Sequence, residues 1–426
     1  MRDTILSGCR NACLWLAFTL LCTMTAIGAE DNVETTLTLK KALALTLAQN
    51  PQLYQYRFTS DALNARRETN GLRPALALEL EVENFAGSGR NQDFDSAETT
   101  LALSSVIELG GKRQARLSYT DARINQAKWE KQAATLDVLG EVTEIYIEGL
   151  ATQANIKLAE ESLLLSKSLL KTVKARSARG AAPEPEVMRA LATLARAEIR
   201  HTALQEQFER QKVLLARFWG ETTVSFKTLK GSLFTFQPTQ NFDQLFARVK
   251  TSPAIQVLAS KSRLQDAAVT LARASGRSDL SWRAGIKHSE ETGDSALTAG
   301  VSIPLFSGSR SSGRVKEALA SRNAVDYAQK DLLLLLHSRL YESWSIRKQS
   351  IAAVNKTQEV AIPALEQALK LTTEAYENGR YRYLDLIAAQ EELLATKQAI
   401  IDTATTALVS QALIERLTSE AINPQS

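Results

Sequence analysis

Residues 99–113, TTLALSSVIELGGKR, decide the fold of this 426-residue chain. Thr99, Leu101 and Leu103 recur at every second position, the period of a β-strand whose two faces differ. The pair Gly110-Gly111 then allows a tight backbone turn. From Lys112 to Arg179 there is no proline, good helix formers dominate, and at 1.5 Å per residue this run predicts a helix about 100 Å long. The chain therefore passes from a strand, through a glycine turn, into one very long helix.

The same order of features occurs a second time about 200 residues later. Residues 297–310, LTAGVSIPLFSGSR, again lead from an alternating segment through a glycine into a helical stretch. Matching positions mark the repeat: Pro51 with Pro253, Ser104 with Ser302, Gly110 with Gly308, and Gly180 with Gly379. A period of this length is too long for a solenoid unit. The sequence therefore predicts a duplicated half-molecule, with a first repeat at 30–220, a connecting segment at 221–250 and a second repeat at 251–426.

The first 29 residues have the features of a secretory signal peptide. Arg2 and Arg10 accompany an apolar run from Ala12 to Ile27, and the small pair Gly28-Ala29 follows. A membrane anchor is the alternative, but the run is short and no stop-transfer pattern follows it. All three cysteines of the chain lie inside this segment. We therefore expect an exported chain without disulfides or thiolate chemistry.

Long helical stretches make up most of the remaining sequence. The first long helix breaks at Gly180, and the second half is expected to repeat this hairpin with a bend at Pro363. The further helices that we expect are Leu39–Gly71, Glu184–Trp219, Pro253–Ser275, Arg314–Asn378 and Leu384–Ala421. The fold class is thus mainly α, with long α-hairpins and a small β part.

Four amphipathic strands lie between the short and the long helices. The residues that alternate along one face of the four strands, nearly all apolar, are Leu76, Leu78, Leu80 and Val82; Thr99, Leu101 and Leu103; Leu280, Trp282, Ala284 and Ile286; and Leu297, Ala299, Val301 and Ile303. Strands of this length and pattern suit a tilted crossing of a bilayer, although a soluble two-layer domain would show similar alternation. Since a membrane barrel needs at least about eight strands, four strands predict an oligomer, and three copies would supply twelve.

This arrangement resembles the TolC-like outer-membrane efflux proteins over essentially the whole mature chain. The run from Ile107 to Arg113 is similar to the CzcC-like subgroup, which serves heavy-metal export. The resemblance implies a homotrimer in the outer membrane of a Gram-negative bacterium, with a twelve-stranded β-barrel in lipid and a helical tunnel across the periplasm. Its implied partners are a periplasmic adaptor and an inner-membrane pump, expected to be proton-driven. The implied function is that of a passive duct for small solutes, with divalent heavy-metal cations as the expected cargo.

The turns between the hairpin helices carry the candidate pore residues. Residues 379–386, GRYRYLDL, resemble the family's motif for the periplasmic mouth and place Asp385 there; Glu186 is its counterpart in the first half. Three copies of each carboxylate would form a negative ring that favours cations. Capping of a helix N-terminus is the alternative role. Many relatives have a second acidic residue three positions on, where this chain has Ala388, so we expect a weaker ring.

Other residues near turns are candidates for contacts between neighbouring tips or for positions at which the backbone turns sharply. Tyr376, Arg380 and Tyr381 are candidates for a latch between neighbouring tips, with ordinary packing as the alternative. Gly110, Gly111 and Gly308 are predicted to be strand-to-helix turns. Basic residues after these turns would meet anionic lipid or simply face solvent; they are Lys112, Arg113, Arg116, Arg310, Arg314 and Lys316.

Motifs for chemistry are scarce. The three histidines are isolated, all cysteines lie in the predicted signal peptide, and no His-x-x-x-His pair, phosphate loop or nucleophile elbow occurs. The net charge of +4 is small for the length, so we expect no nucleic-acid partner. We predict a protein without enzyme activity, cofactor or metal site. A periplasmic coiled-coil adaptor or scaffold remains the alternative class, and drugs or secreted polypeptides remain alternative cargoes.

Overall fold

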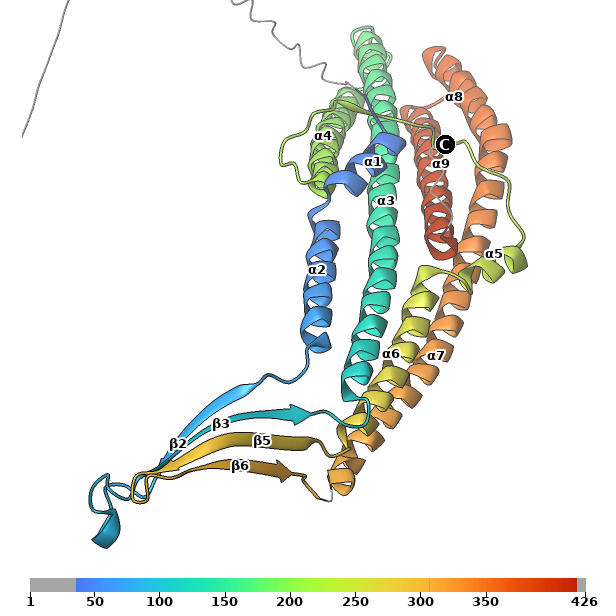
Figure 1. The fold of residues 1–426 in the computed structure, drawn as a ribbon. Helices are drawn as coiled ribbons and strands as arrows, with labels where there is room; N and C mark the ends of the chain where they lie inside the picture. The colour runs from blue at the N-terminus through green and yellow to red at the C-terminus, as the bar shows by residue number, and fades with distance from the viewer. Residues whose placement is uncertain (1–35, 306, 420–426) are drawn as a thin grey trace, which may run out of the picture.

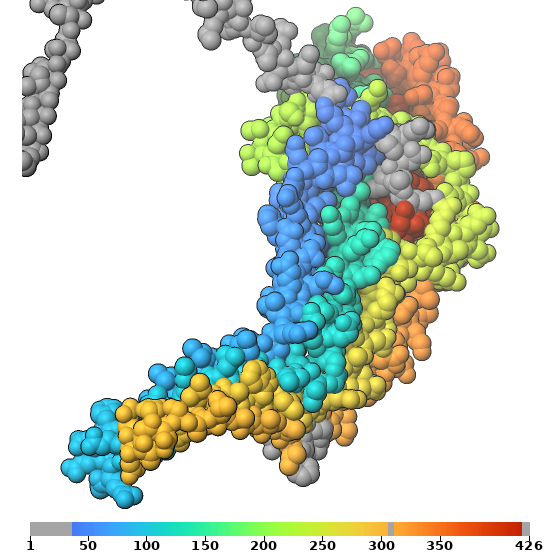
Figure 2. Space-filling view, viewed as in Figure 1, coloured from blue at the N-terminus to red at the C-terminus, as the bar shows by residue number. Residues whose placement is uncertain are grey.

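The computed structural model describes residues 36–305 and 307–419, and the side chains of 307–310 are left undescribed. The predicted signal peptide lies outside these ranges. Long helices stand side by side in a column, and a four-stranded sheet extends from one end of it at an angle (Figure 1). The space-filling view shows the same arm and column as one continuous body (Figure 2).

Nine helices form the described column. The long helices form two hairpins, as the repeat predicted. In the first, α3 pairs with α4; in the second, α7 and its continuation α8 pair with α9. Their bounds are α1 Leu39–Gln49, α2 Pro51–Gly71, α3 Lys112–Ser177, α4 Glu184–Ala216, α5 Phe242–Val249, α6 Pro253–Ser275, α7 Ser307–Lys356, α8 Ile362–Glu377 and α9 Tyr383–Thr418.

The prediction of one helix from Leu39 to Gly71 is wrong, because Asn50 divides it. The Asn50 side chain accepts a hydrogen bond from the amide of Leu53 at 3.1 Å and donates one to the carbonyl of Phe218 at 2.8 Å. Its backbone is extended, and Pro51 is the first residue of α2. An asparagine N-cap before a proline is a strong helix start, so a new helix begins there.

The second long helix begins earlier than predicted and is interrupted where the sequence indicated. α7 starts at Ser307 rather than Arg314, so Gly308 lies inside its first turn and not in the turn before it. A π-helical segment, Thr357–Ala361, separates α7 from α8, and Pro363 is the second residue of α8. Proline lacks an amide hydrogen and forces this local rearrangement.

The sheet joins the two halves of the chain. Its strands are β2 Ala77–Glu83, β3 Glu98–Ile107, β5 Leu280–Ser289 and β6 Ser295–Ser302, in the order β2-β3-β5-β6 with every pair antiparallel. The central pair, β3 and β5, comes from different halves. In the described chain, β2 and β6 each have one neighbour, so each leaves an open edge.

Matching ion pairs support the duplication. Arg67 on α2 pairs with Asp121 on α3 at 2.6 Å, and Asp266 on α6 pairs with Arg322 on α7 at 2.7 Å. Each pair joins a short helix to the long helix of its own half, with the charges exchanged. The halves therefore share a packing scheme, although their sequences have diverged.

The sequence did not indicate a second, smaller sheet on the column. β1, Thr36–Thr38, pairs in parallel with β4, Thr228–Lys230. Tyr146 of α3 donates its hydroxyl to the carbonyls of Leu37 and Lys230, each at 2.8 Å, and the Gln153 amide bonds both backbone groups of Leu229. Two side chains of α3 thus replace the neighbouring strand that β4 lacks. The main hydrophobic core lies in this part of the column, and its residues come from the small sheet, from α1, from the middle of α3 and from the helices packed against them.

Candidate functional site

The main sheet has one apolar face that is exposed in the single chain. Leu78 and Leu80 of β2 are 73% and 69% exposed, and Leu297 and Val301 of β6 are 87% and 67% exposed. The registers place Leu80 beside Leu101, Leu101 beside Ile286, and Ile286 beside Leu297. A continuous exposed apolar surface of this kind marks contact with a partner or a membrane.

The opposite face of the sheet carries a network of ion pairs. Arg283 of β5 reaches over β3 to Glu81 of β2, at 2.6 Å, and Lys287 pairs with Glu98 of β3. Ala102 and Thr100 of β3 are small and lie beneath this crossing, where both are buried. The two faces therefore differ as completely as the sequence alternation predicted.

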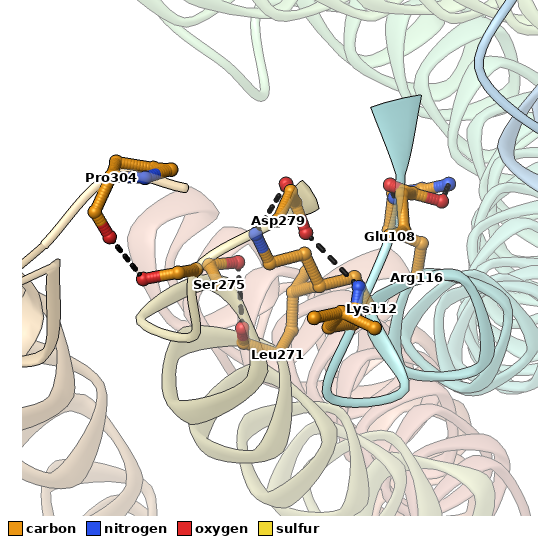
Figure 3. A network of polar contacts seen from close by, with 9 residues as sticks. Glu108, Lys112, Arg116, Leu271, Ser275, Asp279 and Pro304 are labelled. Carbon is orange, nitrogen blue, oxygen red and sulfur yellow. Dashed lines mark hydrogen bonds and ion pairs between the residues drawn. The ribbon is translucent and has the colours of Figure 1, made fainter. Parts of the chain in front are cut away.

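The turns that join the sheet to the column are tied together. Lys112 at the start of α3 pairs with Asp279 at 2.6 Å, and Asp279 also accepts a hydrogen bond from the amide of Leu109 at 3.1 Å (Figure 3). Arg116 pairs with Glu108 in a two-point contact (Figure 3). Because these cations already have partners inside the chain, the structure favours an internal role for them over contact with anionic lipid.

Gly110 and Gly111 occupy this junction as predicted. Both have left-handed backbone angles, with φ of 73° and 71°. A Cβ atom on Gly110 would lie 2.2 Å from Cδ of Arg277, whereas one on Gly111 would meet nothing within 4 Å. The backbone angle thus favours glycine at both positions, and close packing requires it only at Gly110.

At the far end of the column, Asp385 caps α9. Its carboxylate accepts hydrogen bonds from the backbone amide of Arg382 at 3.0 Å and from the Arg382 guanidinium at 3.1 and 3.2 Å. These bonds from Arg382 lower the pKa of Asp385. The capping role is therefore present in the single chain, and the charge of Asp385 is partly balanced by its neighbour.

Glu186 and Tyr376 link the two hairpins. The hydroxyl of Tyr376, at the end of α8, donates to the Glu186 carboxylate in the first turn of α4 at 3.2 Å. Tyr376 is 2% exposed and packs against Tyr383 with ring centroids 6.4 Å apart. Burial, together with the charge of Glu186, raises the pKa of Tyr376 to about 12. The structure thus places Tyr376 inside one chain, while Arg380 and Tyr381 are exposed on the turn.

Arg176 in the last turn of α3 completes this tip, and the sequence did not single it out. Its guanidinium donates to the carbonyls of Tyr376, Glu377 and Ala181 at 2.6, 2.9 and 3.2 Å. An arginine in the last turn of a helix is common, because it complements the helix dipole. Nothing in the local pattern distinguishes one that reaches a second hairpin.

The histidines stand apart from one another. His201 faces Glu160 at 3.6 Å, His288 contacts Ser295 at 3.1 Å, and the ring of His337 packs edge-on against Phe246. Within residues 36–305 and 307–419, no group of three or more His, Cys, Asp and Glu side chains is arranged to hold a metal ion. Over the same ranges, no helix is both long enough and apolar enough to cross a membrane.

Comparison with curated proteins gives relatives that match over most of their length. The chain is 24% identical over 364 residues to the cobalt-zinc-cadmium resistance protein CzcC of Cupriavidus metallidurans, covering 85% of each chain. It is 24% identical over 350 residues to the nickel-cobalt-cadmium resistance protein NccC of Alcaligenes xylosoxydans, covering 82% of this chain and 76% of the relative. It is also 23% identical over 359 residues to the pyoverdine export outer membrane protein OpmQ of Pseudomonas putida, covering 76% and 72%.

Solved structures and a family match agree with the fold. The outer-membrane channel OprN superposes with a TM-score of 0.75 at 19% identity, covering 90% of each chain, and CusC superposes with a TM-score of 0.74 at 15% identity, covering 89% and 92%. Residues 42–221 match the sequence model of the outer membrane efflux protein family. Residues 42–221 are therefore similar to this family, and the chain has the fold of these solved outer-membrane channels.

Proposed function

We propose that this protein is the outer-membrane channel of a tripartite efflux system and acts as a passive trimeric duct. The observation that carries the proposal is the sheet: its exposed apolar face, its charged opposite face and its two open edges stand at one end of a long helical column. Open strand edges are not tolerated in lipid. Three copies would pair the β2 edge of one chain with the β6 edge of the next and close twelve strands into a barrel.

The flanks of the column support a ring of copies. α2 and α4 form one flank and α7 and α8 the other (Figure 1). Large apolar side chains are exposed on both flanks: Tyr54, Phe58 and Ile199 on the first, and Tyr327, Leu334 and Leu371 on the second. Two unlike apolar flanks suit a heterologous contact that closes into a ring. A periplasmic scaffold would not need the apolar sheet, which is why we favour the duct.

We propose divalent heavy-metal cations as the cargo. The relatives named for resistance to cobalt, zinc, cadmium and nickel support this class. The relative named for pyoverdine export supports a small organic solute as the second candidate. Deleting the gene and comparing tolerance of these metals with tolerance of dyes and siderophores distinguishes the two. Unchanged metal tolerance alongside a siderophore or dye defect would replace the metal assignment.

The hairpin tips are proposed as the periplasmic mouth. Three copies each of Asp385 and Glu186 would then contribute a negative ring, weakened by Arg382 and by the Tyr376 hydrogen bond. Exposed Arg380 and Tyr381 are proposed as contacts between neighbouring tips. A periplasmic adaptor and an inner-membrane pump would dock here. We also propose that the chain divides into a first repeat at 30–220, a connecting segment at 221–250 and a second repeat at 251–426.

Single-channel recording in a planar bilayer tests the duct directly. The purified protein should give stepwise openings, and Asp385→Ala should lower its preference for cations. If the openings of Asp385→Ala have the same cation preference as those of the unsubstituted protein, Asp385 acts only as a helix cap. A protein that extracts from cells without detergent and never conducts would instead support the periplasmic scaffold.

A further inference from the structure

We infer that a patch of aromatic side chains around α5 binds the glycan strands of the peptidoglycan cell wall. The inference rests on the proposed duct, because a column that stands in the outer membrane and extends into the periplasm must pass the wall. It concerns a surface away from both the sheet and the hairpin tips. We call this surface the aromatic patch, and it consists of Phe242, Phe246, His337, Tyr341 and Trp344.

The aromatic patch lies partway along the column. α5 packs on α7 and α9 through Leu245 and Val249, which are buried, and it stands at the edge of the column beside α7 (Figure 1). At 1.5 Å per residue, the α7 members of the patch begin about 45 Å along that helix from Ser307. The patch is therefore separated from the proposed barrel and from the proposed mouth, so neither lipid nor a partner at the tips covers it.

The rings of the patch hold one another in place. Phe242 lies at the centre and meets the rings of His337 and Tyr341 edge-on, at centroid distances of 5.3 and 5.4 Å. Trp344 lies 5.9 Å from Phe242, and its indole nitrogen donates to the carbonyl of Gln240 at 2.9 Å. Because these contacts restrict the rings, a ligand that binds them loses little affinity to side-chain ordering. Tyr341 is nevertheless 53% exposed, so its ring is open to a ligand.

The chemistry of the patch is complementary to an anionic glycan. An aromatic face carries negative partial charge, so the C–H groups of a sugar ring stack favourably on it. Lys348 lies 5.3 Å from the centre of the Trp344 ring, and Lys250 lies 4.8 Å from that of Phe246. Both lysines are exposed. Peptidoglycan combines sugar rings with the carboxylates of its peptide stems, and it therefore offers a partner for the rings and for the cations beside them.

A second copy of this chain is the other candidate occupant, and the charges argue against it. Contact between copies would remove Lys250 and Lys348 from water, which is costly unless each gains a carboxylate partner. Exposed Asp243 and Glu342 lie beside members of the patch in the sequence, and carboxylates accept hydrogen bonds from sugar hydroxyls. A hydrated glycan strand leaves these charged groups partly in water. The cell wall is therefore the occupant that this surface fits better.

Binding to isolated cell walls tests the inference. The purified protein in detergent is mixed with insoluble peptidoglycan sacculi, and the bound fraction is measured after sedimentation. Tyr341→Ala should weaken binding by about tenfold, the order expected for loss of one ring contact. Tyr381→Ala is the matched control, because Tyr381 is 52% exposed but lies at the hairpin tip, and it should bind as the unsubstituted protein does. Lys348→Gln should weaken binding and make it less sensitive to salt.

Trimer content and conductance separate this inference from its alternatives. If Tyr341→Ala binds sacculi as well as the unsubstituted protein does, the inference is overturned. If it lowers the trimer content while the remaining trimers bind sacculi normally, the patch is a contact between copies and the inference is again overturned. Channels that conduct but never bind sacculi would leave the duct standing and refute the wall contact. Binding that depends on Tyr341 in a protein that never conducts would support the wall contact and refute the duct. Lys348→Gln changes an exposed side chain and keeps the test valid should Tyr341→Ala fail to fold.

Discussion

Tyr376 lies between Arg176, whose guanidinium is 4.6 Å from its ring centre, and Glu186, which accepts its hydroxyl hydrogen at 3.2 Å. The tyrosine is on α8, the arginine ends α3, and the glutamate begins α4. A side chain of the second hairpin is therefore held by both helices of the first. This relationship makes the tip a joint between hairpins, and it underlies the first two predictions.

Tyr376→Phe should loosen this joint without emptying the core around it. The ring and its contact with Arg176 remain, while the Glu186 carboxylate loses its neutral donor. We expect a loss of about 1 kcal/mol in the free energy of unfolding, the usual contribution of one such hydrogen bond. Thermal unfolding in detergent measures it. Tyr381→Phe is the matched control, because Tyr381 is exposed on the same turn, and an equal effect of both substitutions would contradict the prediction.

The tip should also lose stability at high pH. The pKa of Tyr376 is raised to about 12 by burial and by Glu186, whereas an unfolded tyrosine titrates near about 10. The neutral hydroxyl therefore contributes stability that is complete below about pH 10 and is lost as the pH rises through the folded pKa. Burial likewise raises the pKa of Tyr146, which lies beneath the small sheet, to about 12.

Absorbance of the phenolate checks this assignment. The chain has nine tyrosines, and the difference between titrations of the unsubstituted protein and Tyr376→Phe isolates one of them. A difference curve with its midpoint at about pH 10 would show an ordinary tyrosine and refute the buried arrangement. Titration near about 12 that moves downward when Glu186 is changed to Gln would support it.

Gly110→Ala should be far more harmful than Gly111→Ala. Both residues have left-handed backbone angles, so each alanine costs about 1–2 kcal/mol in backbone strain. Only at Gly110 would the new Cβ overlap Arg277, with Cδ at 2.2 Å and Cβ at 2.9 Å. Denaturation in detergent compares the two variants, and Arg277→Ala should rescue Gly110→Ala in part, because it removes Cδ and Cγ and keeps Cβ. Equal costs at both glycines would contradict the packing argument.

Much of the fold was predictable because its signals are local and repeated. The alternation that includes Leu78, Leu80 and Leu297 indicated the strands, and the proline-free run after Lys112 indicated α3. The family predicted from the duplicated order of elements agrees with the match over residues 42–221. The break at Asn50 was missed although Asn50-Pro51 is itself a local signal for a helix start. The second bond of this side chain, to the carbonyl of Phe218, is not local and could not be predicted.

The elements that escaped prediction depend on contacts between distant residues. β1 and β4 have three residues each, too few for a periodic pattern, and they form because Tyr146 and Gln153 of α3 bond their backbones. Arg176 likewise acquires its role only from carbonyls about 200 residues away. The acidic candidates were visible in the sequence, but the partners that balance them, Arg382 and Tyr376, follow from the geometry.

Leu297→Lys should prevent assembly in the membrane, whereas Thr298→Lys should not. Leu297 is 87% exposed on the apolar face of β6 beside Ile286, and Thr298 is opposite Gly285 on the charged face. A lysine facing lipid costs up to about 2–4 kcal/mol, the value at the bilayer midplane. A lysine at position 298 would instead lie on the face that carries Glu79. The amount of trimer in outer-membrane fractions measures the difference. If both variants assembled equally, the apolar face would not contact lipid, and the four strands would belong to a soluble domain instead.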